Sequence, residues 1–240
     1  MTRPAIFLDR DGVINCNRPD HVKSWPEFEF LPGAIKALQR LSQLGWPVVV
    51  VTNQAVVGRG LVNRRTVEEI HAQMMAAVCG AGGRMDDVLY CPHGPEDRCA
   101  CRKPRPGLLL LASARLGLDL SRSFMVGDAE SDVFAAQAVG CRPVLVKTGR
   151  GVGHLGLLRQ NHVRGYYLAD DLADAVSWIL GPGWMTKFYP FSNPMPARET
   201  SILPNTLSDA TPWLIEAQSF SLLRRATRSL LANRRKPSQG

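Results

Sequence analysis

Two aspartates lie two positions apart after a short apolar run, and their spacing suits metal-assisted chemistry. Residues 5–8 are apolar and are followed by Asp9-Arg10-Asp11-Gly12, so both carboxylates leave the end of a predicted buried strand. Carboxylates this close repel each other unless a cation lies between them, and Mg²⁺ is the natural oxygen-seeking partner. One carboxylate could attack phosphorus while the other donates and later removes a proton. The structural alternative is an Asp-rich turn in which Gly12 permits an unusual backbone.

A second polar cluster follows the apolar run 48–51. Thr52, Asn53 and Gln54 carry hydroxyl and amide groups, which can hydrogen-bond phosphate oxygens without adding charge. Taken alone, this cluster is explained as well by Thr52 or Asn53 capping the next turn.

A lysine and two further carboxylates complete the set of candidate residues. Lys103 lies in the basic segment 102–105 ahead of a predicted helix, where its ammonium group could neutralise a phosphoryl group. Asp128 follows the apolar run 124–126, and Asp132 lies one helical turn later. A solvated loop and a helix cap are the ordinary explanations for these residues. Because the clusters recur at successive strand ends, one shared site explains them better.

Alternating apolar runs and helical patterns predict an α/β fold. This alternation indicates a doubly wound, mostly parallel sheet with helices on both faces, and such sheets bind ligands beyond the carboxyl ends of their strands. The predicted strands are residues 5–8, 48–51, 88–90, 124–126 and 144–146, and the predicted helices begin after Pro32-Gly33 and span 64–79, 107–117, 131–139 and 170–180. The polar clusters are therefore expected to meet at one edge of the sheet.

Four metal-binding side chains lie close together in a short polar loop. Cys91 and His93 form a C-x-H pair, and Cys99 and Cys101 form a C-x-C pair after five intervening residues. Three thiolates and one imidazole suit tetrahedral Zn²⁺, and four protein ligands leave no open position, so we expect a structural site. Bound zinc would fix the neighbouring Lys103 against the substrate. The alternative is four unrelated residues in a polar loop.

Composition bounds the class of protein. The chain has 240 residues, of which 45% are hydrophobic and 21% are charged, as in an ordinary folded protein. No apolar run is long enough for a membrane-spanning helix, and the N-terminal segment does not resemble a secretory signal. We therefore expect a cytoplasmic protein whose six cysteines are metal ligands or buried thiols rather than disulfides.

The sequence changes character after residue 182. Residues 1–182 carry the fold pattern, residues 183–212 read as a Pro-rich linker, and residues 213–240 form a basic amphipathic tail with the pattern of a short helix. Residues 183–240 hold eight basic and three acidic side chains, so they supply most of the net charge of +8. The tail could dock on a protein partner or an anionic surface, and a phosphatase-like binding module that uses it is an alternative of another class.

The residues at the predicted sheet edge resemble the four motifs of the haloacid-dehalogenase-like phosphatases. These motifs are D-x-D, a strand-ending Thr or Ser, a Lys and G-D-x-x-x-D, and their order and spacing match over about residues 4–180. The resemblance implies that Asp9 is the nucleophile, that Asp11 is the general acid and base, and that Thr52 and Lys103 stabilise the phosphoryl group.

The same resemblance implies a metal site. Mg²⁺ would bind Asp9, Asp128 and the backbone carbonyl of Asp11, while Asp132 would orient its neighbours.

Residues 91–107, together with the motifs that follow residues 8 and 51, resemble one branch of this family. That branch contains the D-glycero-D-manno-heptose 1,7-bisphosphate 7-phosphatases and the histidinol-phosphatase domain. Its members have a zinc loop in place of a large cap domain, and we expect no large cap domain here. The substrate-binding residues that the resemblance implies are Asn17, Arg18, Pro19, Asp20, Thr52, Asn53, Gln54, Ala55, Arg59, Arg102 and Lys103.

Two departures from that branch bear on the substrate. Residues 55–58 replace a small Gly-containing loop, and Ala129 stands where relatives often carry lysine. Arg18, Arg59 or Arg105 could supply the missing charge for a second phosphate, because a guanidinium group binds phosphate through two parallel hydrogen bonds.

The leading hypothesis is a Mg²⁺-dependent monomeric phosphatase that acts on a small phosphorylated metabolite through an aspartyl-phosphate. The best candidate reaction removes the 7-phosphate of D-glycero-D-manno-heptose 1,7-bisphosphate on the way to a nucleotide-activated heptose. Histidinol phosphate or another small sugar phosphate is the alternative substrate, and we expect no nucleic-acid partner. His71, His154 and His162 are expected to be structural residues.

Overall fold

Residues 2–182 are the part of the chain that the computed structural model describes, and they contain a six-stranded parallel sheet. The strands are β1 (Ile6–Leu8), β2 (Val48–Asn53), β3 (Asp87–Cys91), β4 (Phe124–Gly127), β5 (Arg142–Val146) and β6 (Tyr167–Ala169), in the order β3-β2-β1-β4-β5-β6. The predicted doubly wound α/β fold is confirmed, and its strand order reverses between β1 and β4. The predicted linker 183–212 and tail 213–240 lie outside the described residues.

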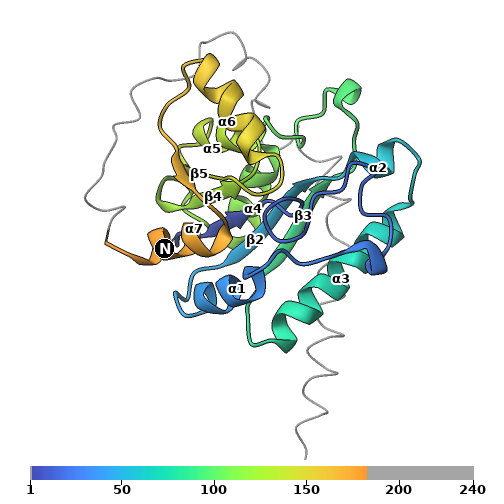
Figure 1. Cartoon of the computed structure of the whole chain (residues 1–240), viewed down its shortest axis with the longest axis horizontal. Coiled ribbons are helices and arrows are strands. Elements are labelled where there is room, and N and C mark those ends of the chain that lie inside the picture. Colours follow the sequence, from blue (N-terminus) through green and yellow to red (C-terminus); the bar gives the residue numbers. More distant parts are fainter. Residues whose placement is uncertain (1, 183–240) are drawn as a thin grey trace, which may run out of the picture. The chain divides into compact units, whose positions relative to one another are not determined.

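Helices cover both faces of this sheet (Figure 1). On one face pack α1 (Ala34–Ser42), α3 (Arg64–Gly80) and α7 (Leu172–Leu180), and on the other pack α4 (Gly107–Leu116), α5 (Glu130–Gln137) and α6 (Gly151–Gln160). The shorter elements are α2 (Ala55–Gly58) and the 3-10 turns η1 (Trp25–Glu27), η2 (Pro95–Asp97) and η3 (Leu120–Arg122).

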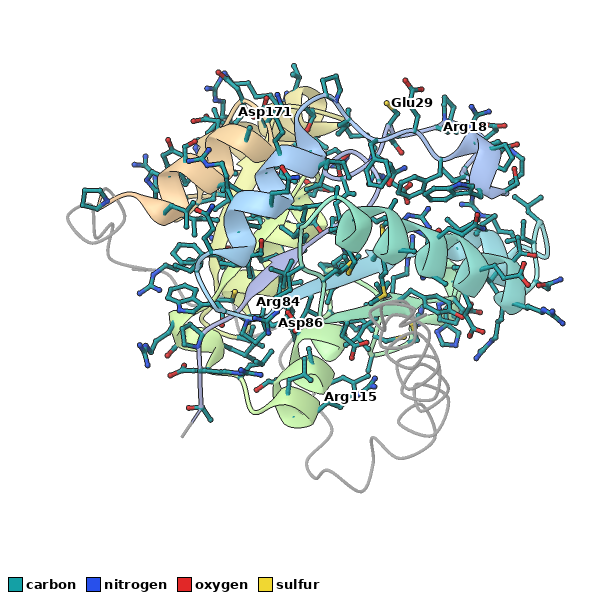
Figure 2. The ribbon with its side chains drawn as sticks, turned by 90° about the horizontal axis from the view of Figure 1, so that it is seen from below. Arg18, Glu29, Arg84, Asp86, Arg115 and Asp171 are labelled. Atoms are coloured by element: carbon teal, nitrogen blue, oxygen red, sulfur yellow. The ribbon has the colours of Figure 1, made fainter. Side chains whose placement is uncertain are left out.

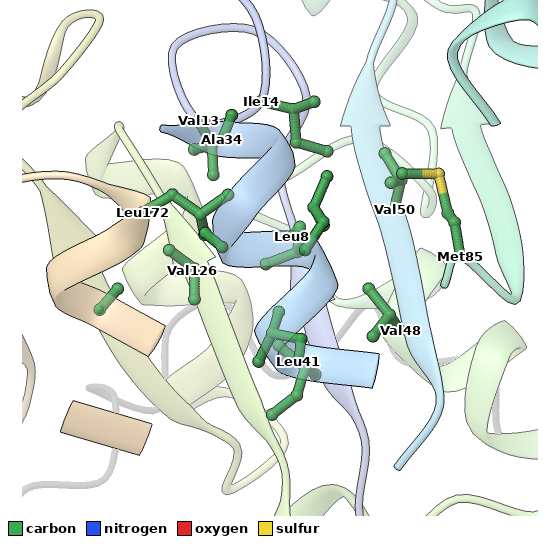
Figure 3. Packing of buried hydrophobic residues seen from close by; sticks show 14 of the residues in the cluster. Leu8, Val13, Ile14, Ala34, Leu41, Val48, Val50, Met85, Val126 and Leu172 are labelled. Carbon is green, nitrogen blue, oxygen red and sulfur yellow. The ribbon is translucent and has the colours of Figure 1, made fainter. Parts of the chain in front are cut away.

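The main core lies between the sheet and α1. Leu8, Val48 and Val126 are fully buried and face Ala34 and Leu41 of α1 (Figure 3). Burying a side chain of this size stabilises the fold by about 1.5–3 kcal/mol. The rigid packing fixes β1, β2 and β4, the strands whose carboxyl ends carry the candidate site.

Local sequence explains where two of the helices begin. Asn63 caps α3 by accepting a hydrogen bond from the Thr66 amide at 2.8 Å, and Asp171 caps α7 in the same way through the Asp174 amide at 2.8 Å. Each cap satisfies an amide that has no partner inside its helix.

The sequence patterns did not predict the helices α2 and α6, the strand β6 or the three described 3-10 turns. Three glycines, Gly151, Gly153 and Gly156, lower the helix propensity of α6, and α2 and β6 are too short to show a periodic pattern. Since α6 packs through Leu158 against β5 and α5, tertiary contacts rather than local preference stabilise it.

The edge of the sheet formed by the amino ends of its strands is stabilised by an ion pair and a hydrogen bond. Arg84 and Asp86, labelled in Figure 2, pair at 2.8 Å just before β3. Asp86 also accepts a hydrogen bond from the Val48 amide at 2.9 Å. These groups tie together the amino ends of β2 and β3 and leave the carboxyl ends free for chemistry.

The connections after β1 and β2 pass the carboxyl edge of the sheet. In the described chain, η1 and α1 lie between β1 and β2, and α2 and α3 lie between β2 and β3. Neither connection contains a separate cap domain. Among the described helices, none combines the length and the apolar character needed to cross a bilayer.

Candidate active site

Four predicted site residues meet in a buried cluster at the carboxyl edge of the sheet. Asp9 follows β1, Thr52 lies near the end of β2, Lys103 precedes α4 and Asp128 follows β4. Their exposed fractions are 5%, 1%, 3% and 0%, respectively. Charges this far from water interact strongly, so small displacements here change protonation and metal binding.

Lys103 links the two sides of the cluster. Its Nζ lies 3.0 Å from Oδ2 of Asp9 and 2.5 Å from Oδ1 of Asp132, and it donates to the Val51 carbonyl at 2.8 Å. Burial lowers the pKa of Lys103, but the charges of Asp132 and Asp9 outweigh this effect and raise the pKa above its ordinary value. Asn53 clamps the Lys103 backbone through two hydrogen bonds of 3.0 Å. The lysine is therefore a fixed positive charge.

Asp11 accepts hydrogen bonds from three side chains. Arg10 Nη2 donates to both of its oxygens at 2.9 and 2.8 Å, Asn15 donates at 2.9 Å and Gln54 donates at 2.8 Å. Burial raises the pKa of Asp11, but the charge of Arg10 and these hydrogen bonds outweigh it, so the pKa lies below its ordinary value. Gln54 also donates to Thr52 Oγ1 at 3.0 Å, which connects the D-x-D segment to the end of β2.

Three buried carboxylates converge beside Lys103. Oxygens of Asp9, Asp128 and Asp132 lie within 4.8 Å of one another. Burial and the charge of Asp9 raise the pKa of Asp128. Burial also raises the pKa of Asp132 to about 7, even though the charge of Lys103 opposes the shift. The negative charge is thus incompletely balanced, and a divalent cation held by Asp9 and Asp128 would relieve the repulsion, so this donor set fits Mg²⁺.

Two glycines allow the loops after β1 and β5 to close around Asp128. Gly12 and Gly149 have φ angles of 84° and 59°, and a Cβ atom on either would overlap the Asp128 carboxylate. Thr148 Oγ1 donates to the Gly12 carbonyl at 2.6 Å, and the Arg150 amide donates to Asp128 Oδ2 at 2.8 Å. The Asp128 carboxylate is therefore held by backbone that admits no larger residue at these positions.

The cysteine and histidine loop gathers its four side chains into one cluster. Cys101 Sγ lies 3.3 Å from Cys91 Sγ, 3.4 Å from Cys99 Sγ and 3.3 Å from His93 Nδ1. A hydrogen bond from Cys101 lowers the pKa of Cys91 to about 5, whereas burial raises the pKa of Cys99 and the hydrogen bond with Cys91 raises that of Cys101, so the thiolate is favoured at Cys91. A tetrahedral zinc ion with Zn–S bonds of about 2.3 Å needs ligand atoms about 3.8 Å apart. The donor set and its spacing fit Zn²⁺.

The backbone of the loop that carries these four side chains contacts the arginines next to Lys103. Arg102 Nη1 donates to the His93 carbonyl at 3.1 Å, and Arg105 Nη1 donates to the Cys99 carbonyl at 3.1 Å. The loop carbonyls orient both guanidinium groups, so the fold of the loop bears directly on the segment that carries Lys103.

The remaining predicted substrate-binding residues lie outside the buried cluster. Asn17, Pro19 and Asp20 are exposed in the segment between β1 and η1, and Ala55 is buried at the start of α2. Arg18, visible in Figure 2, pairs with Asp20 at 3.2 Å.

Arg59 is brought to the same segment from a different part of the chain. Its Nη1 lies 2.9 Å from Nε2 of His21. Arg18 therefore lies within the segment between β1 and η1, and Arg59 contacts the same segment through His21.

Sequence reasoning missed three residues that contact the site. Arg10 and Asn15 bind Asp11, and Arg150 Nη2 lies 3.4 Å from Asp128 Oδ1. The position of Arg150 after the strand ending at Val146 was an available signal, because every strand of a parallel sheet ends at the same edge. Arg10 follows β1 and carried the same positional signal, but its burial depends on packing against α3 and Phe28.

Comparisons with known proteins identify the family of this chain. The HAD-hydrolase-like family matches residues 100–175. A D-glycero-β-D-manno-heptose-1,7-bisphosphate 7-phosphatase from Pseudomonas aeruginosa is 45% identical over 180 residues, which cover 75% of this chain and 99% of that protein. The protein of the same name from Bordetella bronchiseptica is 42% identical over 175 residues, covering 73% of this chain and 97% of that protein.

Two solved structures of heptose bisphosphate phosphatases also match this chain. The crystal structure of the D,D-heptose 1,7-bisphosphate phosphatase from B. bronchiseptica, complexed with magnesium and phosphate, matches with a TM-score of 0.70 and 42% identity and covers 74% of this chain and 98% of its own. The D,D-heptose 1,7-bisphosphate phosphatase from Burkholderia thailandensis matches with a TM-score of 0.58 and 33% identity, covering 75% and 99% of the two chains. The chain therefore belongs to the phosphatases of the haloacid-dehalogenase-like family, in the same branch as these relatives.

Proposed function

We propose that this enzyme hydrolyses the 7-phosphate of D-glycero-β-D-manno-heptose 1,7-bisphosphate through an aspartyl-phosphate formed on Asp9. The observation that carries the chemical part is the buried contact of Lys103 Nζ with Asp9 Oδ2, 3.0 Å apart, beside the carboxylate of Asp128. The substrate rests on the 45% identity to a relative of that name along 99% of its length.

In the first half of the reaction, an oxygen of Asp9 attacks phosphorus and the bond from phosphorus to the sugar oxygen breaks. Asp11 gives its proton to that oxygen, so the sugar leaves as an alcohol. The incoming phosphate places negative charge beside Asp11, which raises the pKa of this carboxyl and favours the protonated form that the step requires. Lys103 and the Thr52 hydroxyl interact with the phosphoryl oxygens.

In the second half, Asp11 acts as a base. Its carboxylate takes a proton from water, the water oxygen attacks phosphorus, and the bond between phosphorus and Asp9 breaks to release inorganic phosphate. The hydrogen bonds from Arg10, Asn15 and Gln54 favour the carboxylate form of Asp11, which is the form that accepts this proton.

The proposed enzyme binds two metal ions. Mg²⁺, bound by Asp9, Asp128 and the Asp11 carbonyl, would supply positive charge that offsets the phosphate oxygens. Zn²⁺ would be structural, held by the four side chains of the zinc-loop cluster, Cys91, His93, Cys99 and Cys101. Its support is the spacing of their ligand atoms, which lie within 4.8 Å of one another.

Cationic side chains outside the buried cluster suit a substrate with two phosphates. Arg18, Arg59 and Arg105 carry guanidinium groups, and such groups bind phosphate in two-point geometry. They could replace the lysine that relatives carry at the position of Ala129.

Phosphate release tests the substrate. The purified enzyme is assayed with Mg²⁺ on the β- and α-anomers of heptose 1,7-bisphosphate, on histidinol phosphate and on simple sugar phosphates. We expect kcat/KM for the β-bisphosphate to exceed the others by about a hundredfold, or about 2.7 kcal/mol of transition-state discrimination. A higher value for histidinol phosphate would replace the substrate but keep the chemistry.

Trapping of the intermediate tests the covalent chemistry. Acid quenching during turnover of ³²P-labelled substrate should give labelled wild-type protein, whereas Asp9→Asn should give neither label nor turnover, because an amide is a poor nucleophile. Circular dichroism and zinc content of the variant should match the wild type. Label on Asp9→Asn would exclude Asp9 as the nucleophile.

A further inference from the structure

Arg10, between the two catalytic aspartates in sequence, is the largest fully buried side chain among the described residues, with 1% exposure. Its Nη2 donates to both oxygens of Asp11, at 2.9 and 2.8 Å. Its Nη1 lies 3.1 Å from Nε2 of His71. The guanidinium group also lies over the ring of Phe28, with 6.0 Å between Cζ and the ring centroid. Contacts from separate parts of the chain therefore hold Arg10 in one orientation.

His71 is a rigid partner for this arginine. It lies on α3 with 0% exposure. Its ring meets the ring of Tyr90 edge to face, with centroids 5.4 Å apart and an interplanar angle of 66°. Tyr90 in turn donates to Glu68 Oε1 at 3.2 Å. The imidazole is thus fixed between α3 and β3, and its Nε2 faces Arg10.

The ring of His71 can only accept the hydrogen bond from Arg10. A guanidinium group has donors and no acceptor, so Nε2 must carry the lone pair and the ring proton lies on Nδ1. Burial and the charge of Arg10 hold the pKa of His71 well below its ordinary value, which keeps the ring neutral. A neutral acceptor at this position lets a buried guanidinium group satisfy one of its donors without a second negative charge.

We propose that His71 is a positioning residue for proton transfer, because it fixes the Arg10 guanidinium that orients the Asp11 carboxylate. The inference rests on the proposed function, in which Asp11 is the general acid and base. Asn15 and Gln54 also hold Asp11, so losing the acceptor on His71 weakens proton transfer without abolishing it.

Leaving-group dependence separates this role from a structural one. The test compares kcat/KM for p-nitrophenyl phosphate, whose phenolate leaves without protonation, with kcat/KM for the sugar phosphate that the wild-type enzyme hydrolyses fastest. Both constants report the steps up to the first phosphoryl transfer, in which Asp11 acts as the acid. For His71→Phe we expect about a tenfold loss with the sugar phosphate and less than about a threefold loss with p-nitrophenyl phosphate.

Matched variants control for altered packing. His71→Met also removes the acceptor and gives a second folded candidate if the phenylalanine ring does not fit. His71→Gln retains an acceptor oxygen and should recover most of the activity on the sugar phosphate. Ile70→Val trims a neighbouring buried side chain of α3 with 1% exposure and should change neither constant. Melting temperatures establish that each variant is folded.

The results can separate the role of His71 from the proposed function. Losses of equal size on both substrates, or no loss on the sugar phosphate in the folded Phe and Met variants, would overturn the role of His71. A wild-type enzyme inactive on both substrates would instead contradict the proposed function itself.

Discussion

At the scale of single residues, the main feature of the site is that its charged side chains are buried. Asp9, Asp128 and Asp132 lie almost out of contact with water, and Lys103 is the side chain that contacts both Asp9 and Asp132. Removing one partner of such an arrangement leaves an uncompensated charge in a region of low polarity, whereas the same change at the surface leaves a solvated group.

Replacing Lys103 by methionine should therefore reduce both stability and turnover. We expect a loss of about 3–5 kcal/mol in the free energy of unfolding, because Asp132 and Asp9 lose their cation, and a fall in kcat of about 10²–10³-fold, because the phosphoryl group loses a fixed positive charge. Urea titration and steady-state kinetics measure the two effects.

Lys147→Met is the matched control for this change. Lys147 Nζ lies 2.5 Å from Asp170 Oδ1, but the two side chains are 45% and 75% exposed. This variant should be indistinguishable from the wild type in both assays. Equal effects of the two substitutions would show that the buried position of Lys103 is irrelevant.

At the scale of elements, the turns that follow β1 and β5 decide the shape of the proposed metal site. Gly12→Ala should lower kcat/KM by at least about tenfold and raise the Mg²⁺ concentration needed for half-maximal rate, because the added Cβ would overlap the Asp128 carboxylate.

Gly117→Ala separates this collision from backbone strain. Gly117 also has a positive φ of 63°, but nothing lies within 4 Å of an added Cβ. We expect it to cost about 1 kcal/mol of stability and to leave kcat/KM and the Mg²⁺ requirement unchanged. A normal Mg²⁺ requirement in Gly12→Ala would contradict the proposed crowding at Asp128.

The zinc-loop cluster gives a prediction at the same scale. Cys99→Ser should reduce bound zinc well below one ion per chain and lower the melting temperature by about 4–8 °C, equivalent to about 2 kcal/mol. Turnover should fall as well, because the loop carbonyls orient Arg102 and Arg105. Metal analysis, calorimetry and kinetics provide the readouts.

Cys79→Ser is the control for the loss of a thiol. Cys79 is an exposed free cysteine on α3, away from the cluster, and its replacement should change none of the three measurements. Unchanged melting and turnover in Cys99→Ser after verified loss of zinc would remove the structural role of the metal.

At the scale of the whole molecule, every residue assigned to the proposed reaction lies between Asp9 and Asp128. A chain ending at residue 182 should therefore fold and retain kcat and KM within about twofold of the full chain, because the described residues contain a complete core and the entire site. Loss of activity or of folding on truncation would mean that residues 183–240 contribute to the catalytic domain.

The alternating pattern was enough to predict the fold but not every element. Five of the six strands were predicted, because parallel strands buried on both faces appear as continuous apolar runs. The pattern missed β6 and α6, since a strand of three residues and a helix with three glycines carry little local signal. Their formation depends on packing against β5.

The sequence by itself determined the fold class, the family and the gathering of Asp9, Thr52 and Asp128 at one edge, because the carboxyl ends of parallel strands meet there whatever the details of packing. Only the tertiary structure decided that Arg10 is buried and that His71, 61 residues away, holds it. The physical reason is that such contacts join separate elements, and their distances depend on how helices pack on the sheet rather than on periodicity along the chain.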